Sequence, residues 1–109
     1  MDTATPTSNG LMQAFAYGTQ TICTQLYIVP NQPIVFASDV KQTKRSEDQI
    51  MSFGWKKFLE NTTGYEWLPH LPMTKSGSLA MDVIQDFSQS QLGVTLEKFT
   101  VAGASKRGW

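Results

Sequence analysis

The stretch Thr21–Val29 constrains the fold more than any other part of the sequence. It is rich in β-branched and aromatic residues, and as an extended chain it carries apolar side chains on both faces. One face holds Ile22, Leu26 and Ile28, and the other holds Cys23, Tyr27 and Val29. Such a strand must be covered on both sides, as strands of parallel sheets are. We therefore expect a buried strand, ended by Pro30 and Pro33, which cannot donate to a β-ladder.

Two segments on either side of this strand have helical periodicity. The first carries apolar residues at helical spacing (Leu11, Met12, Phe15, Ala16) and ends at Gly18, which predicts a short helix packed on an apolar surface. After a long connection, the sequence Ser46-Glu47-Asp48-Gln49 fits a capping box and predicts the start of a second helix. Its expected buried stripe is Met51, Trp55, Phe58 and Leu59, and Asn61–Gly64 ends it.

A third helix is expected from Pro72, whose missing amide costs nothing in a first turn, to a left-handed closure at Gly93. Its inward stripe is Met73, Gly77, Ala80, Met81, Ile84 and Phe87. Because glycine costs about 1 kcal/mol relative to alanine inside a helix, Gly77 indicates close backbone packing.

The order of the elements predicts the fold class. Lys98–Ala102 alternates, with Phe99 and Val101 inward, and reads as a second strand. Two strands joined by a long helical crossover fit a parallel pair in an α/β fold. With 109 residues, the chain is at most one domain, which runs from a Ser/Thr/Pro/Gly-rich loop at residues 1–10 to a turn at Gly103–Gly108.

Charge and composition exclude several kinds of partner and site. Nine Lys plus Arg balance nine Asp plus Glu, so we expect no nucleic-acid partner, and no apolar run reaches the roughly 20 residues of a membrane-spanning helix. One Cys and one His give no metal-ligand cluster, and we expect no metal or other cofactor. Cys23 is expected as a small buried apolar residue. Residues 1–10 have no pattern of a secretory signal, so they do not indicate the compartment.

The turn after the second predicted strand is the candidate site. A serine between glycines in that place is typical of a nucleophile elbow, so Ser105 is the candidate nucleophile. The amide of Lys106 would face the oxyanion, and amides near Asn9 and Gly10 are candidates for the second donor. The turn departs from the usual G-x-S-x-G pattern, because glycine is delayed to Gly108.

Simpler interpretations stand beside this one. A Gly-Ser turn is ordinarily only a turn, and the side chains of Lys106 and Arg107 either attract an anionic group or reach into solvent. His70 lies between two prolines and reads as a loop residue. Asp82 and Asp86 read as the solvated side of their helix. Asn61-Thr62-Thr63 matches a glycosylation acceptor, a triplet that often arises by chance.

Four separated blocks carry a family resemblance: Gln25–Pro33, Arg45–Asp48, Leu71–Lys75 with Ala80–Asp82, and Gly103–Trp109. Together they resemble the PhoPQ-activated pathogenicity-related family, which includes proteins called autocrine proliferation repressors. The resemblance implies a partial α/β-hydrolase fold with parallel strands and crossover helices, truncated just after the elbow. Ser105 would be the nucleophile, and Gly103 and Gly108 would shape its turn.

The same resemblance implies that the chain is a fragment. In elbow enzymes the acid and the histidine follow the serine, and only four residues follow Ser105, so His70 cannot complete a triad. Without a base, the chain alone is not expected to turn over a substrate. The remainder of the parent domain would be its partner. The parent would be a serine hydrolase with an unknown small-molecule or peptide substrate, or a secreted, non-catalytic regulator of proliferation or virulence. A small independent binding module is a third reading.

Overall fold

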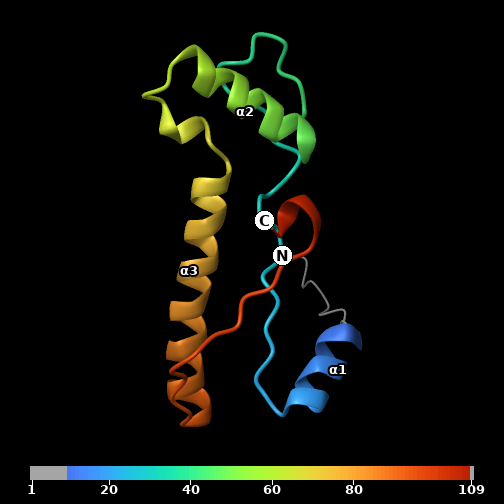
Figure 1. The fold of residues 1–109 in the computed structure, drawn as a ribbon, viewed down its shortest axis with the longest axis vertical. Coiled ribbons are helices and arrows are strands. Elements are labelled where there is room, and N and C mark those ends of the chain that lie inside the picture. The colour runs from blue at the N-terminus through green and yellow to red at the C-terminus, as the bar shows by residue number, and fades with distance from the viewer. Residues whose placement is uncertain (1–9, 109) are drawn as a thin grey trace, which may run out of the picture.

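The computed structural model describes residues 10–108, and in that range the protein is helical (Figure 1). Its α-helices are α1 (Gly10–Thr19), α2 (Asp48–Glu60) and α3 (His70–Phe87). Three short helical turns complete it: the 3-10 turn η1 (Tyr65–Trp67), the π-helical turn η2 (Ser88–Leu92) and the 3-10 turn η3 (Ser105–Arg107). None of the helices in this range is long and apolar enough to cross a membrane.

The predicted α/β fold with parallel strands is wrong for the described residues. Neither Thr21–Val29 nor Lys98–Ala102 forms a strand there, and the β-pairing seen is a single antiparallel bridge between Ile34 and Arg45. The apolar side chains of the first segment are 44% to 66% exposed (Ile22, Leu26, Tyr27, Ile28), and Cys23 is half-buried. A strand needs neighbours that pair its backbone and cover its faces, and residues 10–108 supply none here.

The predicted helix boundaries agree with the structure better than the predicted buried faces do. α1 spans the predicted segment, but it contains no buried residue, and Leu11 and Phe15 are more than half exposed. The expectation that α1 packs on an apolar surface is therefore wrong within this part of the chain.

α2 begins within two residues of its predicted start and ends where the sequence predicts, but its cap and buried face differ. Glu47 is the N-cap, with φ of 46°, and no side chain caps the helix; the amide of Gln49 donates to the carbonyl of Ser46 at 3.0 Å. Ile50 and Gly54 are buried, whereas the predicted core residues Trp55 and Leu59 are 45% and 71% exposed. The buried face is therefore rotated relative to the predicted stripe.

An aromatic cluster explains this rotation. The rings of Phe36 and Phe53 stack with centroids 4.7 Å apart, and Trp67 lies 5.8 and 6.2 Å from them. The Arg45 guanidinium sits 4.1 Å above the Phe53 ring. α2, the loop before it and η1 lie together at one end of the molecule (Figure 1). Contacts from outside the helix therefore decide which side of α2 turns inward.

Asp39 holds the loop before α2 in place. Its carboxylate accepts hydrogen bonds from the amides of Lys41 and Thr43 at 3.1 and 3.0 Å and pairs with Arg45 Nη1 at 2.6 Å. The bond from Arg45, with those from the two amides, lowers the pKa of Asp39 from 3.8 to about 2, against a smaller opposing effect of burial. The charged form of Asp39 therefore stabilises the folded loop.

We expect the free energy of unfolding to fall as the pH drops from about 4 to about 2. Above pH 3.8 the folded and unfolded chains both carry a charged Asp39, and this contribution is complete; below it the unfolded chain takes up the proton first. Urea unfolding followed by circular dichroism at several pH values measures the effect. Asp39→Asn is expected to be less stable at pH 7 and to lose less stability over this interval. Equal pH profiles for both proteins would contradict the assignment.

α3 starts two residues earlier than predicted and continues into the π-helical turn η2. His70 is its first residue and not a loop residue, and Gly93 closes η2 with φ of 66°, as predicted. Most of the predicted inward stripe is half-buried (Met73, Gly77, Ala80, Met81, Ile84). Phe87 is instead 58% exposed, and Ser88 is buried. A Cβ built at Gly77 would meet no atom within 4 Å, so close backbone packing does not explain this glycine.

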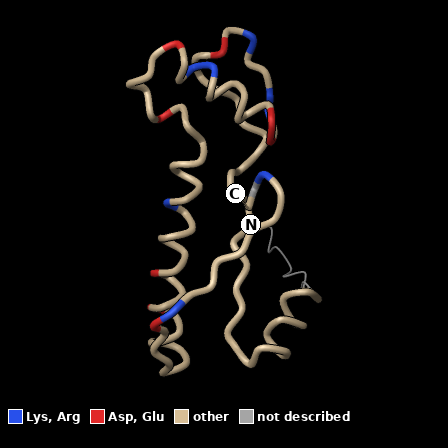
Figure 2. Tube along the Cα trace, in the orientation of Figure 1, with Lys and Arg blue, Asp and Glu red and all other residues tan. Residues whose placement is uncertain are grey.

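The whole molecule is less compact than a domain of its size. Its radius of gyration is 17.3 Å, whereas roughly 13 Å is typical of 109 folded residues. Its accessible surface is 8810 Å², against roughly 6,000 Å² for a folded monomer of this mass. Charged residues gather toward the α2 end, whereas α1 and the segment after it carry none (Figure 2). Large apolar surfaces are therefore open in this structure.

Candidate functional site

The candidate site is the serine turn, which we define as Gly103–Gly108. The chain enters it extended, with φ of −128° and ψ of 139° at Ala104, and reverses at Ser105, where φ is 57°. The amide of Gly108 donates to the carbonyl of Ser105 at 3.0 Å and closes the turn η3. The Ser105 side chain is exposed. A non-glycine residue with positive φ is uncommon, and such strained residues cluster at functional sites.

Two glycines make this turn possible. A Cβ built at Gly103 would overlap the backbone of Gly108, and one built at Gly108 would overlap the backbone of Gly103 and Ala104. The two ends of the turn thus approach more closely than any side chain allows. The sequence singled out both glycines as the residues that shape the turn, and their close approach fits that role.

The side chain of Lys106 anchors the turn to α2. Its Nζ lies 2.6 Å from Oδ2 of Asp48, 58 residues earlier in the chain. The hydrogen bond to Asp48, and the charge of that carboxylate, raise the pKa of Lys106. The sequence left open whether Lys106 attracts an anionic group or reaches into solvent; here it pairs with the first residue of α2. The side chains are 36% and 71% exposed, so added salt weakens the pair.

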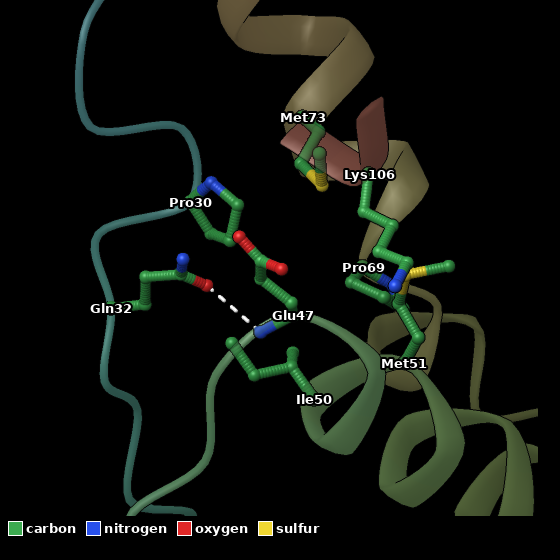
Figure 3. Close-up of a pocket in the computed structure, with 8 residues that line it drawn as sticks. All are labelled: Pro30, Gln32, Glu47, Ile50, Met51, Pro69, Met73 and Lys106. Carbon is green, nitrogen blue, oxygen red and sulfur yellow. Dashed lines mark hydrogen bonds between the residues drawn. The ribbon is translucent and has the colours of Figure 1, made fainter. Parts of the chain in front are cut away.

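A hollow beside this ion pair is a feature that the sequence did not predict. Its cavity volume is about 10 Å³, room for about one water molecule. Its lining residues are Pro30, Gln32, Glu47, Ile50, Met51, Pro69, Met73 and Lys106 (Figure 3). The Glu47 amide donates to Oε1 of Gln32 at 2.9 Å and links two segments of the wall. Each of the four blocks that carry the family resemblance contributes to this lining, which is the sequence signal that could have revealed it.

Gly10, another predicted site residue, is not brought to the serine turn. Asn9 lies outside the described residues, and Gly10 is the exposed first residue of α1. A Cβ built at Gly10 would meet no atom within 4 Å, so Gly10 is not packed against the turn. His70, at the start of α3, is half-buried. Across residues 10–108, no three His, Cys, Asp or Glu side chains are placed to share a metal ion.

Comparison with known proteins identifies the family. A family model described as PhoPQ-activated pathogenicity-related protein matches residues 2–109. The chain belongs to this family. The family model confirms the resemblance predicted from the four blocks, but it does not establish an α/β-hydrolase fold, which the described residues do not form.

One curated relative of this chain extends the comparison. Autocrine proliferation repressor protein A of Dictyostelium discoideum is 47% identical over 81 residues, which are 74% of this chain and 16% of the relative. The chain therefore spans about a sixth of that protein's length. No solved structure is significantly similar to the chain.

Proposed function

We propose that this chain supplies the nucleophile of a serine hydrolase that cleaves an ester or an amide in a longer protein of the family. The observation that carries the proposal is the backbone of Ser105, an exposed serine with φ of 57° at the apex of a turn that two glycines close. Strain of this kind persists only where the surrounding structure imposes it. A sharp turn that lifts one hydroxyl clear of its neighbours is what a nucleophilic serine requires.

In the proposed reaction, Ser105 Oγ attacks the carbonyl carbon while a base takes its proton. The amide of Lys106 stabilises the oxyanion, the leaving alcohol or amine departs with the proton, and water then hydrolyses the acyl-enzyme. Among the described residues, no hydrogen bond activates the Ser105 hydroxyl. The base therefore comes from further polypeptide of a longer family protein, and the chain alone is inactive. A second oxyanion donor near Asn9 and Gly10 would require α1 to approach the turn.

A fluorophosphonate probe tests this proposal. The test protein is a chimera in which this chain replaces the matching part of the Dictyostelium relative. We expect the probe to label the chimera on the peptide that carries Ser105, and we expect Ser105→Ala to abolish that labelling. Ser90→Ala, at another exposed serine, is the matched control and should label like the parent. Labelling that is equal in Ser105→Ala and in the parent chimera would overturn the proposal.

The name of the relative favours a second candidate function. A protein called an autocrine proliferation repressor is named for a regulatory effect, and a scaffold can be kept without its chemistry. In that case this chain belongs to a secreted, non-catalytic regulator of proliferation. The chimera added to growing Dictyostelium cells distinguishes the two functions. Growth inhibition that survives Ser105→Ala supports the regulator, and inhibition lost with the hydroxyl supports the hydrolase.

A further inference from the structure

α3 has an apolar stripe that nothing in the described chain covers. We define the outer stripe as Leu79, Val83 and Phe87, which are 52%, 66% and 58% exposed. Residues four apart stack on one face of a helix, so the three side chains form one continuous surface along two turns. A helix packed on one side only needs an apolar arc of roughly 100°. The outer stripe lies beside the inward-facing side of α3 and makes the apolar face of this helix wider than packing on one side requires.

The inner side of α3 is already partly occupied by its own chain. Met73, Ala80 and Ile84 are half-buried there. Past η2 the chain turns back along the helix, where Gln85 Nε2 donates to the carbonyl of Leu96 at 2.9 Å and Thr95 Oγ1 donates to Gln89 at 2.7 Å. α3 itself forms one flank of the molecule (Figure 1). The returning segment therefore leaves the outer stripe open.

Two acidic residues edge the outer stripe. Asp82 and Asp86 lie four residues apart beside it, about one helical turn, and are the acidic residues of α3. Neither forms an ion pair with another residue in the range 10–108. A surface with an apolar centre and an acidic edge fits a partner with apolar side chains flanked by Lys or Arg.

We propose that the outer stripe is the surface on which further polypeptide of a family-length chain packs, with apolar side chains on the stripe and basic side chains facing Asp82 and Asp86. The length of the Dictyostelium relative argues for this occupant, because the matched part is only 16% of that protein. The open structure agrees, since its accessible surface of 8810 Å² exceeds that of a compact monomer by roughly 2,800 Å². The proposal does not depend on hydrolase activity.

Cysteine accessibility tests this proposal. Val83→Cys reports on the outer stripe, and Ser78→Cys, exposed on another face of α3, is its matched control. Both positions fall on the tryptic peptide Ser76–Lys98, which contains no other cysteine, so maleimide labelling can be read there by mass spectrometry. In the isolated chain both cysteines should label at similar rates. In the chimera, Cys at 83 should label at least about tenfold more slowly than Cys at 78.

Other outcomes overturn the proposal. Equal rates at the two positions in the chimera would show that the stripe stays open. Protection of position 83 in the isolated chain that grows with protein concentration would show that a second copy covers it. A second measurement uses Val83→Ser, which should lower the Tm of the chimera by roughly 2 °C and leave helix unfolding of the isolated chain unchanged. An unchanged Tm of the chimera would also count against the proposal.

Discussion

Gly54→Ala in α2 is expected to lower the free energy of unfolding by about 3 kcal/mol. A Cβ at this position would overlap the carbonyl oxygen of Trp67 and would lie 3.3 Å from Cδ of Pro69. The carbonyl oxygen belongs to the backbone and cannot swing aside as the end of a flexible side chain can, so α2 must move away from η1 and pull Phe53 off Trp67. Urea denaturation followed by circular dichroism measures the loss.

Gly77→Ala in α3 is the matched control for this substitution. Both glycines lie inside α-helices, but a Cβ at Gly77 would meet no atom within 4 Å. Alanine should therefore add about 1 kcal/mol of stability there, through its higher helix propensity. If both variants became more stable, the close approach of α2 to η1 would be refuted.

Gly108→Ala is expected to reduce fluorophosphonate labelling of Ser105 by roughly a hundredfold or more in the chimera. The added Cβ would overlap the backbone of Gly103 and Ala104, so the serine turn must open. An opened turn no longer holds Ser105 at positive φ. A displacement of about 1 Å in a reacting atom lowers the reaction rate by roughly a hundredfold. The rate of labelling at the Ser105 peptide is the measurement.

A glycine in open space provides the control for the turn. A Cβ at Gly18 would meet no atom within 4 Å, so Gly18→Ala should label like the parent chimera. Helix content by circular dichroism should be the same in all three proteins, because the serine turn contributes only three helical residues. Normal labelling of Gly108→Ala would show that the glycine pair does not shape the nucleophile.

Local sequence patterns predicted the helices well. The periodicity of Leu11, Met12, Phe15 and Ala16 located α1, and the left-handed closure at Gly93 was correct. The start of α2 was right within two residues, although the backbone carbonyl of Ser46, and not its side chain, accepts the hydrogen bond from the amide of Gln49. Helix signals lie within a few residues of each other, so a single sequence contains them.

Contacts between distant segments could not be predicted in the same way. The aromatic packing of Phe36, Phe53 and Trp67 turned α2, and nothing within α2 specifies partners so far away in the chain. Gly77 was singled out as a packing glycine, whereas Gly54 has that role. The pairing of Lys106 with Asp48 and the hollow beside it also join segments that no local pattern connects.

The predicted strands show a different limit. Thr21–Val29 has the composition of a buried strand. Composition indicates that a segment favours burial between other elements, but it does not show whether the chain supplies those elements. In residues 10–108 no partner pairs its backbone, and φ of 60° at Ile28 bends the chain before Pro30.

The sequence alone determined three helices, with limits correct to within about two residues, a serine between two glycines in the turn Gly103–Gly108, and membership of a family. Those properties depend on residues that are close together in the sequence, so the order of the residues is enough to determine them. The tertiary structure decided which helix faces are buried, that Gly103 and Gly108 touch, and that Lys106 binds the start of α2. These properties depend on free energies summed over groups far apart in the chain, and only the folded arrangement brings such groups within contact distance.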